Sequence, residues 1–167
     1  KAGFNSGMIL DGKLNDIPIV KNFAEALEQA DSTPDYFIFG KAPASGMLSV
    51  DERRLILEAM SCGLNIVNGL HEFLSDDPIF IAACATNQVE IYDIRKPPAV
   101  KNLRMFSGKI SGVNCPRIAV LGTDCAIGKR TTAVALTQAL NDCGIKAVMV
   151  GTGQTTLIQG LNYGVVL

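Results

Sequence analysis

The segment with the clearest chemistry lies between two glycines in the last third of the chain. It reads Gly122-Thr123-Asp124-Cys125-Ala126-Ile127-Gly128-Lys129-Arg130-Thr131-Thr132. Glycines at both ends allow the backbone amides to turn inward around an anion, and the start of a helix adds roughly half a positive charge at the same place. Lys129 adds a full charge suited to the outer phosphates. The pattern predicts a phosphate-binding loop that joins a strand to a helix.

This loop departs from the commonest phosphate-binding pattern in two ways. Five residues separate Gly122 from Gly128 where four are usual, and Arg130 stands where a serine or threonine hydroxyl ordinarily binds Mg²⁺. Thr131 or Thr132 is the candidate for that metal contact, displaced by one or two positions. Phosphate binding is therefore predicted more strongly than Mg²⁺-dependent hydrolysis. ATP and acetyl-CoA are both candidate ligands, because both carry phosphates.

A second polar loop follows the next predicted strand and reads Gly151-Thr152-Gly153-Gln154-Thr155-Thr156. In a parallel sheet it leaves the same edge as the phosphate-binding loop. Gln154 is a candidate catalytic residue that orients a water or a substrate carbonyl. Thr152 and Thr155 are candidates to contact a phosphate or a metal. The alternative interpretation is a glycine-rich turn that binds nothing.

Polar side chains also follow each predicted strand in the first half of the chain. They are Lys41 and Ser45, then Asn68, His71 and Glu72, then Asp93 and Arg95. The carboxyl ends of parallel strands share one edge, where ligands bind. His71, the single histidine, and Glu72 are candidate catalytic residues, with the imidazole as general base. Lys41, Ser45, Asn68 and Arg95 are substrate-binding candidates, with Lys41 and Arg95 suited to a carboxylate. The alternative for His71 is a side chain that packs at a helix turn, and the alternative for Lys41 and Arg95 is ordinary solvated cations.

An alternation of apolar runs and helical patterns must position these residues. Strands are predicted over 17–20, 36–39, 64–67 and 89–92. Helices are predicted from Asn22 to about residue 30, from Ser49 to residue 62 and from Asp77 to residue 87, each with a side-chain cap. The spacing of roughly 25 residues predicts an α/β fold with a parallel, doubly wound, Rossmann-like sheet.

The chain is predicted to hold two domains. The first domain covers residues 1–112 and the second covers residues 113–167. A linker with turn-forming Pro, Ser and Gly residues spans the junction, over residues 95–116. The second contains predicted strands over 117–121 and 146–150 around a helix over 129–143. The first half contains no Gly-x-Gly-x-x-Gly sequence, so NAD is not expected as a cofactor.

Composition excludes several classes of protein. The 167 residues are 48% hydrophobic, which excludes a disordered chain, and the net charge of −1 gives no basic surface for nucleic acid. No apolar run approaches the ~20 residues that span a membrane. Five cysteines without a Cys-x-x-Cys pair favour a reducing, cytoplasmic location, and the single histidine excludes a multi-histidine metal site.

Four motifs together resemble a known two-domain family. They are the two glycine-containing loops, residues 69–78 (GLHEFLSDDP) and residues 93–98 (DIRKPP). The family was long described only as a domain of unknown function, and it includes D-glutamate N-acetyltransferases. The resemblance covers essentially the whole chain. It implies a Rossmann-like first half without its first strand and helix, an incomplete P-loop second half, and an enzyme that acetylates the amine of a D-amino acid.

Other functions remain open at this point. The phosphate-binding loop alone is similar to that of dethiobiotin synthetase, which implies an ATP-dependent, ligase-like enzyme. A nucleotide-binding regulator without catalysis is a second alternative, and a nicotinamide-dependent oxidoreductase is the weakest. A small-molecule substrate is expected in the enzymatic cases. The apolar surface of an incomplete P-loop domain also leads us to expect a homo-oligomer.

Overall fold

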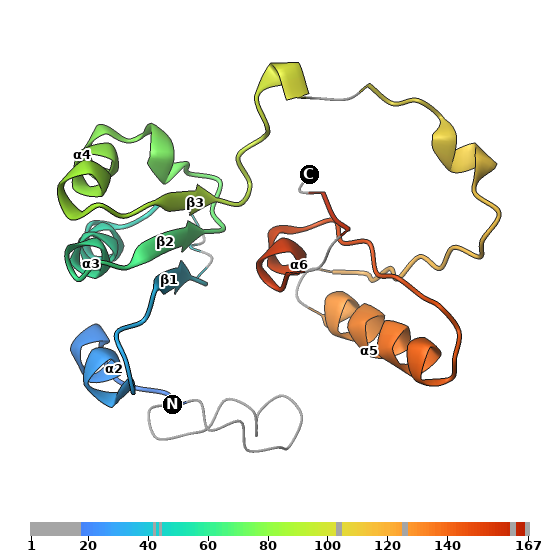
Figure 1. Cartoon of the computed structure of the whole chain (residues 1–167), viewed down its shortest axis with the longest axis horizontal. Coiled ribbons are helices and arrows are strands. Elements are labelled where there is room, and N and C mark those ends of the chain that lie inside the picture. The colour runs from blue at the N-terminus through green and yellow to red at the C-terminus, as the bar shows by residue number, and fades with distance from the viewer. Residues whose placement is uncertain are drawn as a thin grey trace. The chain divides into compact units, whose positions relative to one another are not determined.

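The chain forms two compact units, Lys1–Asp93 and Ile94–Leu167 (Figure 1). The computed structural model describes residues 18–41, 43, 45–102, 105–124, 127–160 and 163–165. Within these residues, every helix is too short or too polar to cross a lipid bilayer.

A three-stranded parallel sheet forms the centre of the first unit. Its strands are β1 (Tyr36–Phe39), β2 (Asn65–Asn68) and β3 (Ile91–Asp93), in that spatial order. The register pairs Phe39 with Asn68 and Asn68 with Asp93. The carboxyl ends of all three strands therefore lie in one row, as the predicted sheet requires.

Three helices of this unit begin where the sequence predicts them. They are α2 (Phe23–Gln29), α3 (Val50–Ser61) and α4 (Pro78–Asn87). The caps predicted at Asn22, Ser49 and Asp77 are confirmed, because each side chain accepts a backbone N–H from the first turn of its helix. Gly63, with φ at +83°, follows the end of α3 and allows the chain to turn back into β2.

One buried cluster joins helices α3 and α4 to the sheet. Ile56 and Met60 of α3, Ile66 of β2 and Phe80 of α4 are fully buried, together with Leu74 in a short 3-10 helix, η1 (Leu74–Asp76). Burial of each such side chain contributes roughly 1.5–3 kcal/mol to folding. Tyr36, Ile38 and Tyr92 are exposed instead.

The predicted strands of this unit need small corrections. Residues 18–20 belong to no ladder, and Ile17 lies outside the described residues. β2 begins one residue later than predicted, and β3 covers 91–93 rather than 89–92. Val89 is instead buried in the core before the strand begins, which explains why an apolar residue there indicated a strand.

The described part of the second unit contains two α-helices and two short 3-10 helices. The elements are α5 (Lys129–Asp142), α6 (Gln154–Ile158), Val100–Asn102 and Lys109–Gly112. The predicted start of α5 at Lys129 is confirmed, and Gly144, with φ at +78°, ends it as expected. The helix α6 lies where the sequence predicts only a polar loop.

The strands predicted over 117–121 and 146–150 are wrong for the described residues. Neither segment belongs to a β-ladder, and the described part of this unit holds one isolated parallel bridge, Gly151 to Gly164. Apolar pattern alone does not make a strand, because its backbone N–H and C=O groups need a neighbouring strand. Both segments instead line a common cavity.

Candidate functional site

The predicted phosphate-binding loop leads directly into the N-terminus of α5. Gly128 caps this helix with φ at 96°, a left-handed conformation that favours glycine, and it has no side chain that could bond to the first turn. The first helical hydrogen bond runs from the Thr132 amide to the Gly128 carbonyl oxygen, at 2.9 Å. Cys125 and Ala126, which we predicted as part of the loop, lie outside the described residues. The amides of residues 129–131 lie at the N-terminus of α5 and have no hydrogen-bond acceptor within the helix, so an anion is favoured there.

Close packing inside the loop explains its first glycine. A Cβ atom at Gly122 would lie 2.5 Å from Cδ1 of Ile127 and 2.9 Å from Cδ of Lys129. The Lys129 ammonium group donates a hydrogen bond to the main-chain oxygen of Asp124. Lys129 therefore folds back over the loop that precedes it, and its charge lies close to the helix mouth. Thr123, which we predicted as a further member of the loop, is exposed.

A cavity of about 1050 Å³ brings the two glycine-containing loops together. Its polar wall includes Gly128, Lys129, Arg130 and Thr131 from the first loop, and Gly151, Thr152, Gly153, Thr155 and Thr156 from the second. Its apolar wall consists of residues from the segments 115–121 and 145–150 and from α5. Residues of both loops therefore line one cavity within this unit. The volume suits a ligand larger than a single phosphate.

Only one of the two candidate magnesium ligands lines this cavity. Thr131 lies on its wall, whereas Thr132 does not. Within the described part of the chain, no three His, Cys, Asp or Glu side chains group closely enough to hold a metal ion. Thr131 is thus the better placed hydroxyl for a metal that a bound phosphate would bring with it.

Two predicted site residues, Arg95 and Gln154 of the second loop, contact each other. Arg95 Nη2 donates a hydrogen bond of 2.6 Å to Oε1 of Gln154, which is the first residue of α6. The loop is also packed against itself: a Cβ at Gly151 would lie 2.0 Å from Cγ2 of Thr156, whose side chain is buried. The structure therefore places Arg95 beside the predicted catalytic glutamine.

At the end of β1, the predicted substrate-binding residues contact neighbours in the same unit. Lys41 Nζ lies 2.5 Å from Oε1 of Glu52, and the Ser45 hydroxyl donates to the Met47 carbonyl oxygen at 3.0 Å. The hydrogen bond from Lys41, followed by those from the amide and hydroxyl of Ser49, lowers the Glu52 pKa from 4.5 to about 2. A carboxylate of the chain itself therefore occupies the N-terminus of α3.

Asn68 and Asp93 form a buried polar link at the ends of β2 and β3. Asn68 is fully buried, and its Nδ2 donates to Oδ1 of Asp93 at 2.6 Å and to the Glu72 carbonyl oxygen at 2.8 Å. Asp93 also accepts the backbone amides of Leu74 and Ser75 at 3.2 and 2.9 Å. These contacts hold η1 against the sheet, which is a structural task for a residue we predicted to bind substrate.

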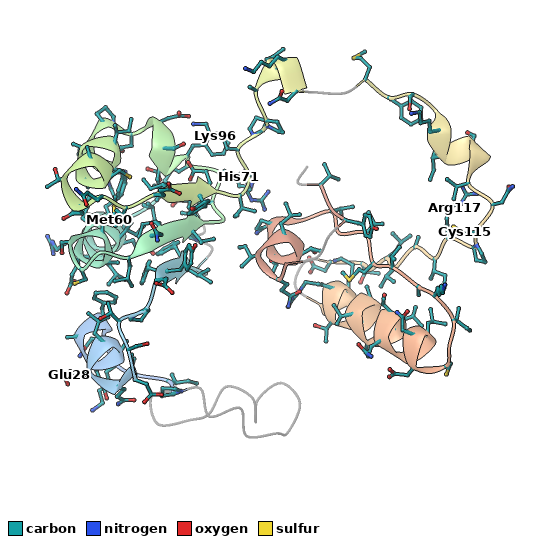
Figure 2. The ribbon with its side chains drawn as sticks, viewed as in Figure 1. Glu28, Met60, His71, Lys96, Cys115 and Arg117 are labelled. Carbon is teal, nitrogen blue, oxygen red and sulfur yellow. The ribbon has the colours of Figure 1, made fainter. Side chains whose placement is uncertain are left out.

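Glu72 and His71 have different surroundings although they are adjacent in sequence. Glu72 accepts hydrogen bonds from the Leu48 amide and from Arg53 Nη1, both at 2.8 Å. The other end of the Arg53 guanidinium donates to Asp77, and this bond holds the Asp77 pKa below its ordinary range. His71 is exposed beyond the carboxyl end of the strands (Figure 2).

Comparison with known families assigns both units. Residues 1–97 match a domain of unknown function described as the DUF1611_N Rossmann-like domain. Residues 104–167 match its companion, described as the DUF1611_C P-loop domain. The chain belongs to the DUF1611 family. The predicted resemblance and the predicted fold class, a Rossmann-like domain followed by a P-loop domain, are confirmed.

A solved DUF1611 protein has a similar fold. The crystal structure of a DUF1611 family protein from Anabaena variabilis superposes with a TM-score of 0.81 at 34% sequence identity. The match covers 99% of this chain and 46% of that one.

Two relatives of this chain carry the name D-glutamate N-acetyltransferase. The protein from Tritonibacter scottomollicae is 30% identical over 121 residues, which are 72% of this chain and 35% of that protein. The protein from a Pseudoalteromonas species is 30% identical over 122 residues, which are 73% of this chain and 36% of that protein. This chain thus spans about a third of the length of either relative.

Arg53 was not predicted from the sequence as the partner of Glu72. Arg53 lies 19 positions before Glu72, inside a helix, with no motif around it. The available signal was a basic residue on α3 among apolar positions, and such a residue often pairs with a buried carboxylate. The helix α6 was not predicted either, because five residues after a Gly-x-Gly sequence are too few to show helical periodicity.

Proposed function

We propose that this DUF1611 chain binds the phosphates of acetyl-CoA at residues 122–132 and serves acetyl transfer to the amine of a D-amino acid such as D-glutamate. The observation that carries the proposal is the N-terminus of α5, where Lys129, Arg130 and Thr131 line a cavity of about 1050 Å³. The names of the two relatives supply the reaction class. The pyrophosphate and ribose phosphate of CoA are anions of the kind a helix N-terminus favours.

Each group in the transfer has a definite task. The substrate amine attacks the thioester carbonyl carbon, so that a C–N bond forms and the C–S bond breaks. The CoA sulfur leaves, and the amine loses a proton to a base. The backbone amides of residues 129–131 and the Lys129 ammonium would hold the phosphates, while a carbonyl oxygen could accept a hydrogen bond from the Gln154 amide nitrogen.

His71 is the residue we propose as the base. It is the single histidine of the chain, and its side chain is exposed rather than used in packing. Its replacement in the variant His71→Gln should lower kcat about 10²-fold or more and leave the KM for acetyl-CoA unchanged. Equal kcat values for wild type and variant would assign the base elsewhere.

Calorimetric titration tests the proposed ligand. The protein is titrated with acetyl-CoA, ATP and NAD, each with and without Mg²⁺. We expect acetyl-CoA to bind without metal and NAD not to bind. Lys129→Ala should weaken acetyl-CoA binding at least tenfold, and the exposed Lys101→Ala serves as the control for loss of one positive charge. Unchanged binding in Lys129→Ala would overturn the phosphate-site assignment.

An ATP-dependent ligase-like enzyme is the second candidate. The observation in its favour is Thr131, whose place on the cavity wall beside Lys129 suits a hydroxyl ligand of Mg²⁺. ATP binding that requires Mg²⁺ and is followed by phosphate release would favour the ligase. ATP binding without turnover would favour a regulator instead.

The setting of the reaction is also part of the proposal. We expect a small-molecule substrate and a homo-oligomer, without nucleic-acid or membrane partners. We place the reaction in the cytoplasm, since Cys62, Cys84, Cys115 and Cys143 are all free thiols.

A further inference from the structure

We propose that Arg95 is a positioning residue for the phosphate-binding cavity, which it serves by holding Gln154 and, through Gln154, the loop 151–156. The proposal rests on the proposed function, because it takes the cavity to bind a phosphate-bearing ligand. It concerns the second unit alone, to which both residues belong.

The contact that carries the proposal is the 2.6 Å hydrogen bond from Arg95 Nη2 to Gln154 Oε1. Both side chains are half-buried, and 59 positions separate them in sequence. A guanidinium group carries donors only, so the atom of the Gln154 amide that faces Arg95 must be its oxygen. Arg95 thereby fixes the amide orientation, and the bond gains strength from the guanidinium charge.

Gln154 lies between residues that line the cavity, although it is not itself a lining residue. Thr152, Gly153, Thr155 and Thr156, on either side of it, line the same cavity as Lys129. Any displacement of Gln154 along the backbone must therefore move the two predicted ligand-contacting hydroxyls, those of Thr152 and Thr155.

The remainder of the loop shows why it needs a side-chain attachment. Its start is fixed by backbone hydrogen bonds from the Gly151 amide to the Tyr163 oxygen, at 3.0 Å, and from the Val165 amide to the Gly151 oxygen, at 2.9 Å. Beyond that point come Gly153, which allows wide backbone freedom, and the five-residue helix α6. A helix of this length is not stable by itself. The bond from Arg95 fixes its first residue.

The matched control is a second arginine of the same unit. Arg117 Nη1 donates to the Ile110 carbonyl oxygen at 2.9 Å, and Figure 2 shows Arg117 well apart from α6. Arg117→Ala removes a guanidinium and a hydrogen bond, as Arg95→Ala does, but leaves the loop untouched. The exposed Gln159, at the other end of α6, supplies the control for Gln154.

The experiment measures the Kd of acetyl-CoA by calorimetry in the whole chain, at a temperature where circular dichroism shows each variant folded. We expect Arg95→Ala and Gln154→Ala each to raise the Kd about tenfold, since a hydrogen bond to a charged group is lost. Arg95→Lys should recover part of the affinity, because its ammonium can donate to the same oxygen. Arg117→Ala and Gln159→Ala should stay within twofold of wild type.

The double variant separates positioning from a general loss of stability. If Arg95 acts through Gln154, Arg95→Ala in the Gln154→Ala background should raise the Kd no further. Additive effects of the two changes, or an Arg95→Ala protein that binds acetyl-CoA as wild type does, would overturn the positioning role and leave the proposed function standing. A wild-type protein that binds neither acetyl-CoA nor ATP would overturn the proposed function and this inference with it.

Discussion

The guanidinium group of Arg53 joins Glu72 to Asp77. Nη1 lies 2.8 Å from Glu72 Oε1, Nη2 donates to Asp77 Oδ2, and Cζ lies 4.8 Å from the centre of the Phe80 ring. The three charged side chains are only 24%, 14% and 22% exposed. One side chain of α3 therefore fixes both the turn after β2 and the start of α4.

Removal of this guanidinium should destabilise the first unit. In Arg53→Ala two poorly solvated carboxylates lose their counter-charge, and the Phe80 ring loses a cation that lies over it. We expect a loss of about 2 kcal/mol in the free energy of unfolding. This value lies between those of exposed and fully buried ion pairs. Urea denaturation followed by circular dichroism measures it.

The neighbouring Arg54 provides the control for this prediction. Its side chain is 74% exposed and pairs with Asp51 at 3.2 Å on the same helix. Arg54→Ala should change the free energy of unfolding by less than about 0.5 kcal/mol, as is usual for a solvated pair. Similar losses in both variants would mean that the Arg53 network adds nothing beyond a surface charge.

The stability of the first unit should depend on the charge of Glu52. Its pKa is about 2 in the folded protein and ordinarily 4.5, so the unfolded chain binds its proton more readily. The stabilisation is therefore complete above pH 4.5 and is lost as the pH falls toward 2. Glu52→Gln removes the charge, and the difference in melting temperature between wild type and variant should shrink across this range.

Glu58, exposed in the last turn of α3, supplies the comparison. Glu58→Gln should differ from wild type by the same small amount at every pH, because it lacks the contacts to Lys41 and Ser49. A gap between wild type and Glu52→Gln that stays constant from pH 6 to pH 2 would show that the capping box works through hydrogen bonds alone.

Substitution of the two glycines at opposite ends of α5 can distinguish an effect on ligand binding from an effect of backbone strain. Gly128 and Gly144 have φ values of +96° and +78°, and a Cβ at either position would meet nothing within 4 Å. Alanine at either position should cost about 1–2 kcal/mol of stability, because a side chain disfavours this backbone conformation. Gly128→Ala alone should also weaken acetyl-CoA binding, about tenfold or more, since it reshapes the helix mouth. Equal affinity in both variants, by calorimetry, would contradict a phosphate site there.

Local signals in the sequence predicted much of the fold. Asn22, Ser49 and Asp77 mark helix starts because a cap acts within three residues, and Gly63 and Gly144 mark helix ends for the same reason. The β1 strand and the order of elements in the first unit followed from apolar patterning. The start of α5 was predictable because Gly122, Gly128 and Lys129 lie close together in the sequence.

Contacts between distant residues were not predictable from one sequence. No local sequence signal indicates that Arg53 bonds to Asp77 or that Arg95 bonds to Gln154. Each contact forms only because the tertiary fold brings distant parts of the chain together. Patterning also failed at 117–121 and 146–150, because a strand depends on partners that the pattern does not specify. The predicted site residues Asn68 and Glu72 are polar residues at a sheet edge, and sequence gave no sign of their structural contacts.

The apolar wall of the cavity should make the chain associate with itself. Ile118, Val148 and Val150 are 65%, 68% and 63% exposed, and all three line the cavity. Exposed apolar surface of this kind is commonly covered by a partner. Analytical ultracentrifugation should therefore show species heavier than 17.7 kDa that increase with protein concentration.

Polar substitution along that wall should reverse the association. The double variant Ile118→Ser and Val148→Ser reduces the apolar area, so the monomer fraction at a given concentration should rise. Met105, 93% exposed and outside the cavity lining, provides the control, and Met105→Ser should leave the distribution unchanged. A wild-type chain that sediments as a monomer at every concentration would contradict the expected association. An equal effect of Met105→Ser would place the contact surface elsewhere.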